Sequence, residues 1–143
     1  MEITRETDYA IRCVLFLSKE PKKVFMVSEI ADKQKVPKAF LAKILQKLVK
    51  GKIATSIRGV KGGFMITKPP RQITMLEVIE AVSGPFSLNT CVLDDTKCER
   101  SNYCSVHPIF VDLQKEFAEK IKKINFKQLV DREKALIKGN RSK

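Results

Sequence analysis

The 143-residue sequence lacks the features of membrane proteins and of secreted proteins. No apolar run approaches the roughly 18 residues that cross a bilayer, and the first residues, MEITRETDYAIR, do not follow the pattern of a signal peptide. Apolar residues make up 43% of the chain, which is too many for an intrinsically disordered protein. We therefore expect a soluble, cytoplasmic protein that forms one domain, or one domain with an extension.

Acidic residues are missing from a long internal stretch. The whole chain has 28 Lys and Arg against 16 Asp and Glu, a formal net charge of +12, yet no acid lies between Lys33 and Met75. A solvated surface usually mixes both signs, so this acid-free stretch favours a polyanionic partner, and nucleic acid over an anionic membrane. Its eleven cations are Lys33, Lys35, Lys38, Lys43, Lys47, Lys50, Lys52, Arg58, Lys61, Lys68 and Arg71.

Three helix signals open the chain. Apolar periodicity predicts a first helix from Thr4 to Lys19. Ser28 is the expected N-cap of a short helix over Glu29–Gln34. A third helix is expected over Pro37–Lys50, because proline is favourable in a first turn and Gly51 follows as a stop.

A hairpin signal follows the three helices. Residues 53–57 and 64–67 alternate apolar and polar side chains around the turn Arg58-Gly59-Val60-Lys61-Gly62-Gly63. Three helices followed by a two-stranded hairpin is the order of a winged helix-turn-helix domain. We therefore predict a mainly α protein with a two-stranded β wing and a long C-terminal helix.

The remaining signals place that long helix after a loop. Thr74 and Glu77 match a capping box for a fourth helix, which Ser83-Gly84-Pro85 ends. Residues 86–105 have a loop-like composition, and an apolar stripe predicts the long helix over about 106–124, with Ser105 as its N-cap and a frayed tail beyond Lys138. We expect a DNA-binding domain over 1–83, a cysteine loop over 84–105, and a dimerisation helix with a tail over 106–143.

The third predicted helix has an apolar side and a polar side at 100° per residue. The side expected to pack inward holds Phe40, Leu41, Ile44, Leu45 and Leu48, and the opposite side holds Ala39, Ala42, Lys43, Gln46 and Lys50. Two small residues allow close approach to a groove, Gln46 is suited to a base edge, and Lys43 to a guanine or a phosphate. This side is the predicted recognition surface.

The glycine-rich turn is the second predicted contact with nucleic acid. Arg58 and Lys61 suit a wing that reaches phosphates or the minor groove. A recognition helix with a wing favours double-stranded DNA over RNA, which remains the alternative partner. The turn lacks the spacing of a nucleotide-binding loop. The predicted DNA contacts are Ser28, Lys38, Ala39, Ala42, Lys43, Gln46, Lys50, Arg58, Gly59 and Lys61.

Three of the four cysteines lie in the predicted loop. Cys91, Cys98 and Cys104 are separated by six and then five residues, and the only histidine, His107, follows closely. In a cytosolic protein such a cluster indicates a metal rather than disulfides. The spacing lacks the close pairs of a zinc finger and better suits an iron–sulfur cluster, with zinc as the alternative.

Three thiolates leave one ligand position for another residue. His107 is one candidate for a fourth ligand and Asp8 is the other. A thiol enzyme that uses Cys104 with His107 has no evident orienting residue, so we do not expect an enzyme. Cys13 shares an apolar stripe with Ala10, and we interpret it as a small buried residue.

Several of these motifs together resemble the Rrf-type family of bacterial winged-helix regulators, the group of IscR, NsrR, RirA and CymR. The resemblance covers almost the whole chain, through TDYAIR, VSEIADKQKVPKAFLAKILQKLVKGKI, SIRGVKGGF, ITMLEVIEAVSGP and CSVHPIF. It implies a homodimer that pairs its long helices and reads a near-palindromic operator. It also implies a 4Fe-4S or 2Fe-2S cluster on the three loop cysteines, completed by His107 as in IscR-like members or by Asp8 of a partner as in NsrR-like members.

The resemblance implies a function as well. We expect an iron–sulfur cluster-dependent transcriptional regulator, a repressor that senses nitric oxide, redox state or iron and cluster status. The alternative is a zinc-bound or metal-free repressor of the same fold. Ala42 stands where IscR-like members often carry an acid used in base discrimination, so the resemblance implies no particular operator sequence.

Overall fold

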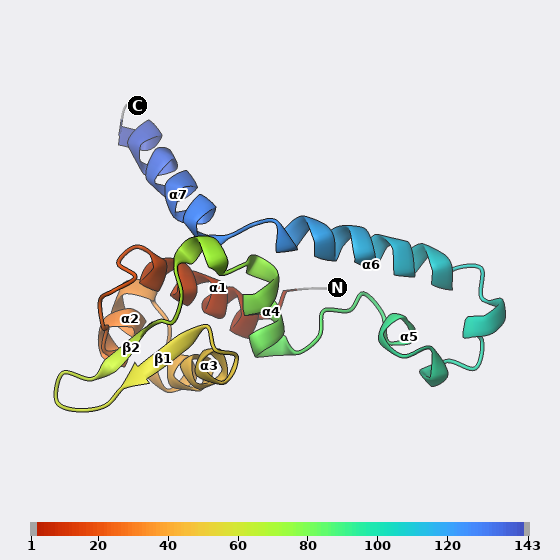
Figure 1. Cartoon of the computed structure of the whole chain (residues 1–143), viewed down its shortest axis with the longest axis horizontal. Helices are drawn as coiled ribbons and strands as arrows, with labels where there is room; N and C mark the ends of the chain where they lie inside the picture. Colours follow the sequence, from red (N-terminus) through yellow and green to blue (C-terminus); the bar gives the residue numbers. More distant parts are fainter. Residues whose placement is uncertain (1–2, 142–143) are drawn as a thin grey trace.

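Three helices and a hairpin form the first part of the fold, in the predicted order (Figure 1). The structure is a computed structural model that describes residues 3–141. Helices α1 (Arg5–Ser18), α2 (Val27–Gln34) and α3 (Lys38–Lys50) precede strands β1 (Ala54–Ile57) and β2 (Gly63–Ile66). The strands pair antiparallel from Ala54↔Ile66 to Ile57↔Gly63. The predicted winged-helix architecture is therefore present.

The core lies among these first helices and the hairpin. Every predicted inward residue of α3 is fully buried except Phe40, which is half-buried and meets the ring of Tyr9 edge-on at 5.8 Å between ring centroids. Cys13 is buried on α1, as its apolar stripe predicted. Since apolar burial is the main favourable contribution to folding, this packing fixes which side of α3 remains outside.

Two predicted N-caps are wrong. Helix α2 begins at Val27 after the extended residue Met26, so Ser28 lies within the helix and does not cap it. The chain is extended there because Phe25 pairs with Phe64 beside the hairpin, and the helix starts as soon as that pairing ends. Helix α6 (His107–Lys122) has Val106 rather than Ser105 at its N-cap, with Pro108 presetting the backbone of its first turn.

The predicted capping box is confirmed at helix α4 (Met75–Ser83). The Thr74 hydroxyl accepts a hydrogen bond from the Glu77 N–H at 3.2 Å, and the Thr74 N–H donates to the Glu77 carboxylate at 2.8 Å. A short 3-10 turn over Pro70–Gln72 connects β2 to this helix. Thus local sequence chemistry sets where α4 begins.

The prediction of a frayed tail beyond Lys138 is wrong as far as residue 141, because a second C-terminal helix, α7, covers Phe126–Arg141. Its first residues return to the winged-helix core: Phe126 is 0% exposed, Val130 is 4% exposed, and the Phe126 N–H donates to the Ile73 carbonyl. The rest of α7 projects away from the body on the side opposite the hairpin (Figure 1). Burial of Phe126 and Val130 therefore anchors a helix whose other residues are mostly polar.

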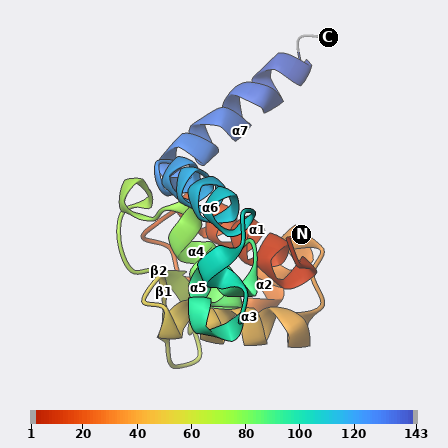
Figure 2. The same ribbon diagram turned by 90° about the vertical axis from the view of Figure 1, so that its right-hand side faces the viewer.

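The cysteine-bearing segment lies at the far end of α6 from the winged-helix core (Figures 1 and 2). It contains helix α5 (Thr90–Leu93) and two 3-10 turns, Asp95–Lys97 and Ser101–Tyr103, rather than one irregular loop. No residue from 84 to 106 is buried. None of the helices described for residues 3–141 is long and apolar enough to cross a bilayer.

Candidate DNA-binding surface and cysteine loop

The outer side of α3 carries most of the predicted DNA contacts. Burial of Leu41, Ile44, Leu45 and Leu48 turns this side outward. Lys38, Ala39, Lys43, Gln46 and Lys50 are exposed, and Ala42 is half-buried. An exposed helix face with two small residues fits the shape of a major groove. Ser28 belongs to a different helix and is half-buried in the first turn of α2.

The turn between β1 and β2 forms a projecting wing. Arg58, Gly59 and Lys61 are exposed at its tip, and Gly59 has φ +116°. The Gly62 N–H donates to the Gly59 carbonyl at 2.9 Å, and a Cβ at Gly62 would overlap the carbonyl of Ile57. Glycine is therefore required at this turn by backbone conformation and by space.

The acid-free stretch is also almost free of internal ion pairs. Among residues 3–141, only Lys47 and Lys68 of its eleven cations lie within 4.0 Å of a carboxylate. Lys47 pairs with Glu6 on α1, and Lys68 pairs with Glu77 on α4. The other nine cations keep their charge available for a partner, so α3 and the wing form a positive surface.

The three loop cysteines occupy three different short turns. Cys91 lies on α5, Cys98 follows the first 3-10 turn, and Cys104 follows the second. All three are half-buried free thiols. Cys13 differs from them, because burial raises the pKa of its thiol to about 12 and keeps it protonated at neutral pH.

The two candidates for a fourth ligand have different surroundings. His107 is the first residue of α6, and its Nδ1 is buried without a hydrogen-bond partner among the residues that the structure describes. Asp8 is exposed on α1 and lies 3.6 Å from the Arg12 guanidinium. A buried nitrogen without a partner is energetically costly, whereas the exposed Asp8 carboxylate already has a cationic neighbour.

The structure does not bring these donors into one metal site. Within the described range 3–141, no three Cys, His, Asp or Glu side chains lie close enough together to hold a metal ion. The chemistry of the donor set nevertheless fits a cluster, since it offers three free thiols and one buried imidazole nitrogen without a partner. Closure of this exposed segment would have to complete the site.

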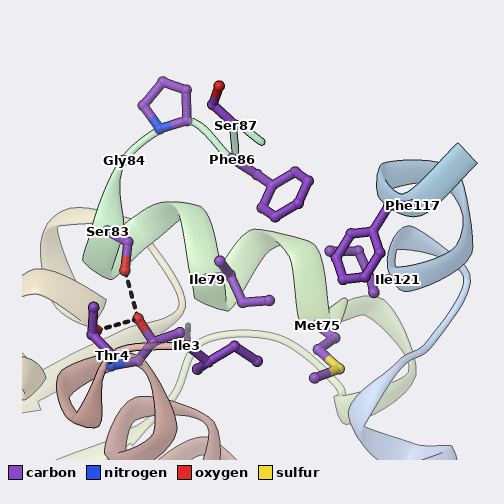
Figure 3. A pocket seen from close by; sticks show the side chains of 12 residues that line it. Ile3, Thr4, Met75, Ile79, Ser83, Gly84, Phe86, Ser87, Phe117 and Ile121 are labelled. Carbon is purple, nitrogen blue, oxygen red and sulfur yellow. Dashed lines mark hydrogen bonds between the residues drawn. The ribbon is translucent and has the colours of Figure 1, made fainter. Parts of the chain in front are cut away.

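A cavity of about 400 Å³ separates the cysteine segment from the core (Figure 3). Phe86 and Phe117 form one wall of it, with stacked rings whose centroids lie 4.9 Å apart. At its other side the Ser83 hydroxyl lies 2.6 Å from the hydroxyl of Thr7. The sequence did not indicate this cavity, because its lining comes from α1, α4, α6 and the segment after α4, which are far apart along the chain.

The comparisons with known proteins agree with the winged-helix fold. The model of the Rrf2 family, described as iron-dependent transcriptional regulators, matches residues 3–132. The chain belongs to the Rrf2 family. It is therefore a transcriptional regulator rather than an enzyme. This confirms the predicted family and the prediction that the protein is not an enzyme.

Individual relatives cover most of this Rrf2-family chain. An HTH-type transcriptional regulator of Aquifex aeolicus is 30% identical over 125 residues, covering 86% of this chain and 87% of the relative. The regulator NsrR of Bacillus licheniformis is 32% identical over 110 residues, covering 76% and 73%. The solved structure of CymR, described as the global cysteine regulator of B. subtilis, is 19% identical with a TM-score of 0.75, covering 92% of this chain and 98% of CymR. The last likeness confirms the fold.

Proposed function

We propose that this Rrf2-family regulator is a homodimeric repressor of the cytoplasm that binds a near-palindromic DNA operator in response to an iron–sulfur cluster on its cysteine segment. The observation that carries the proposal is the state of that segment. Three free thiols lie among residues 84–106, where no side chain is buried. A segment without a core of its own needs another source of order, and soft thiolate ligands favour iron–sulfur clusters.

Partly exposed apolar side chains of α6 support the dimer. Ile109, Leu113 and Phe117 recur every four residues and are 57%, 48% and 39% exposed, so they form an apolar stripe along one helix face. Such a stripe on a soluble protein indicates an interface. We propose that α6 pairs with its twin, within a division into a DNA-binding domain (1–83), a cysteine loop (84–105) and a dimerisation region (106–143).

In this proposal, α3 and the wing contact the DNA. Gln46 would meet a base edge in the major groove, Lys43 a guanine or a phosphate, and Ala39 and Ala42 would allow the helix to approach closely. Arg58 and Lys61 would bind phosphates beside the groove, because both are exposed and form no ion pair within residues 3–141. Two copies of α3 must match half-sites about one DNA turn apart, so a small change in the dimer would alter affinity.

The proposed cluster ligands are Cys91, Cys98 and Cys104, with His107 or a second copy's Asp8 as the fourth. A 4Fe-4S or 2Fe-2S cluster bound there would supply an iron centre that reacts with nitric oxide or oxygen and that is not assembled when iron is scarce. His107 is favoured within one chain because its buried Nδ1 has no partner among the described residues. The three thiols are free, so no disulfide bond has to be reduced before they bind iron.

Anaerobic purification tests the proposal. The wild-type protein should be coloured and contain iron and sulfide, and native mass spectrometry should give the mass of a dimer with its clusters. Replacing Cys91, Cys98 and Cys104 by Ser should remove the iron, whereas Cys13→Ala, the matched control on the buried thiol, should keep it. Comparing His107→Ala with Asp8→Ala identifies the fourth ligand.

DNA binding by the same preparations completes the test. Operator affinity should differ between the wild-type protein and the triple cysteine variant. A colourless protein that contains zinc, with operator affinity independent of the three cysteines, would contradict cluster sensing and favour the zinc-bound repressor.

A further inference from the structure

Lys47 differs from the other cations of α3 because its ammonium group is held by neighbouring helices. Its Nζ lies 2.8 Å from a carboxylate oxygen of Glu6 on α1 and donates a hydrogen bond of 3.1 Å to the carbonyl of Val82 on α4. Lys43 and Lys50 on the same helix are exposed and form no ion pair within the described residues. The charge of Lys47 is therefore directed toward the protein itself.

The bond to Val82 joins the recognition helix to the end of α4. Carbonyls in the last turn of a helix lack partners within that helix and carry partial negative charge. A lysine ammonium group that binds one of them stabilises the helix end. Here the lysine comes from α3, so the bond also fixes α3 against α4.

Two more contacts hold α1 and α3 against the end of α4. The Thr7 hydroxyl on α1 lies 2.6 Å from the Ser83 hydroxyl at the end of α4, and Figure 3 shows Ser83 at the wall of the cavity. At the end of α3, a Cβ on Gly51 would lie only 2.7 Å from the Cβ of Ala81, so the two helices approach closely. We name this contact the three-helix junction and define it as Glu6, Thr7, Lys47, Val82 and Ser83.

The three-helix junction lies where the chain leaves the DNA-binding domain. Helix α4 ends at Ser83, Gly84 follows with φ +80°, and the cysteine-bearing segment begins there. Val82 and Ser83 are the residues through which a displacement of that segment would act on α4. The bond of Val82 with Lys47 would carry it to α3.

We propose that Lys47 is a positioning residue for DNA recognition, which touches no DNA and instead sets the orientation of α3 against α1 and α4. Gln46 precedes it on α3, so a rotation of the helix moves that side chain relative to a base edge. We further propose that changes in the cysteine segment reach α3 through Lys47, a part of the inference that rests on the proposed function. The competing explanation is a direct phosphate contact, because Lys47 lies near the edge of the outer face of α3 and its side chain is 43% exposed.

Glu6→Gln separates the two explanations by the sign of its effect. Loss of a negative charge near DNA should tighten binding if charge alone matters. Loss of the ion pair should instead weaken specific binding, by about fivefold for a partly exposed pair, because α3 loses its orientation. Lys47→Met should behave in the same way, and Lys47→Arg should restore discrimination because it keeps the pair with Glu6.

The assay compares two duplexes by fluorescence anisotropy over a range of salt concentrations. One duplex carries the operator selected by the wild-type protein from a random library, and the other has the same bases in scrambled order. Lys47→Met and Glu6→Gln should lower the operator-to-scrambled affinity ratio about fivefold without changing the slope of log K against log salt. Lys43→Met, the matched control one turn earlier on α3, should reduce that slope by about 0.9 if it removes one phosphate contact.

Three results would overturn the inference in distinguishable ways. A slope for Lys47→Met that falls as it does for Lys43→Met would make Lys47 a phosphate contact. An unchanged affinity ratio in a folded Glu6→Gln protein, checked by thermal unfolding, would remove the positioning role alone. A wild-type protein that binds both duplexes equally would remove DNA recognition by α3 itself.

The link to the cysteine segment has its own double-mutant test. In anaerobic protein, replacing the three loop cysteines by Ser should change operator affinity less in the Lys47→Met background than in the wild-type background. Additive effects would overturn the link and leave the positioning role intact. No effect of the cysteines in either background would overturn the proposed function and the link together.

Discussion

Removal of the two wing cations should change the salt dependence of DNA binding by an amount that the structure sets. Arg58 and Lys61 are exposed, and neither forms an ion pair or side-chain hydrogen bond within residues 3–141. Their replacement by Ala should therefore leave the stability of the fold unchanged within about 0.5 kcal/mol. Any loss of DNA affinity then reports lost contacts with DNA.

The size of the loss follows from counterion release. Each phosphate contact contributes about 0.9 to the slope of log K against log salt, which is about fivefold in affinity at 0.15 M salt. The double variant Arg58→Ala/Lys61→Ala should thus bind about 30-fold more weakly at 0.15 M salt, with a slope reduced by about 1.8. The difference should shrink toward zero as the salt approaches about 1 M.

Anisotropy titrations at four or more salt concentrations measure both quantities. Lys134→Ala is the control, because it removes one exposed charge from α7, on the side of the molecule opposite the wing (Figure 1). Parallel salt plots for the wild-type protein and the double variant would refute phosphate binding by the wing. An equal effect of Lys134→Ala would show that net charge, rather than the wing, controls affinity.

Two further predictions concern stability, measured by urea unfolding. Gly63→Ala should destabilise the fold by about 1–3 kcal/mol, because the new Cβ would overlap the backbone carbonyl of Phe25. Gly139→Ala is the control and should stabilise the fold by about 0.5–1 kcal/mol, because Gly139 lies in open space on α7. Equal effects of the two variants would contradict the packing at the hairpin. Burial alone would raise the pKa of Glu77, but hydrogen bonds from Lys68 and from the N-cap of α4 outweigh it and lower that pKa. Glu77→Gln should therefore cost about 0.5–1 kcal/mol at pH 7, where the unfolded glutamate is also charged, and the cost should vanish as the pH falls through the lowered pKa, below about 4.3. A cost that stays constant down to pH 3 would refute the charge-dependent part.

Local signals in the sequence were sufficient for the elements that carry the proposed DNA contacts. The apolar spacing of α3 predicts which side turns inward, and Thr74 with Glu77 marks the start of α4, because both signals act within one or two turns of helix. Glycines at the wing likewise mark a turn by their own backbone freedom. The two N-cap predictions were wrong because pairing of Phe25 with Phe64 and the position of Pro108 determine where α2 and α6 begin.

The sequence by itself determined the chemistry available to this protein and the order of its first elements. It has a block of eleven cations without an acid, three thiols in a segment that cannot form a core, and three helices followed by a hairpin. Tertiary structure alone decided how those groups are used. Lys47 belongs to the cationic block in the sequence, yet contacts with residues 41 positions before it and 35 positions after it turn its charge toward α1 and α4. In the sequence, Phe126 is one aromatic residue in a polar segment. In the structure its side chain is buried in the core and its N–H donates to the Ile73 carbonyl, and these contacts anchor α7. The periodicity of a sequence predicts only local structure, because it depends on residues a few positions apart. Ion pairs and burial between distant segments depend instead on how the whole chain packs.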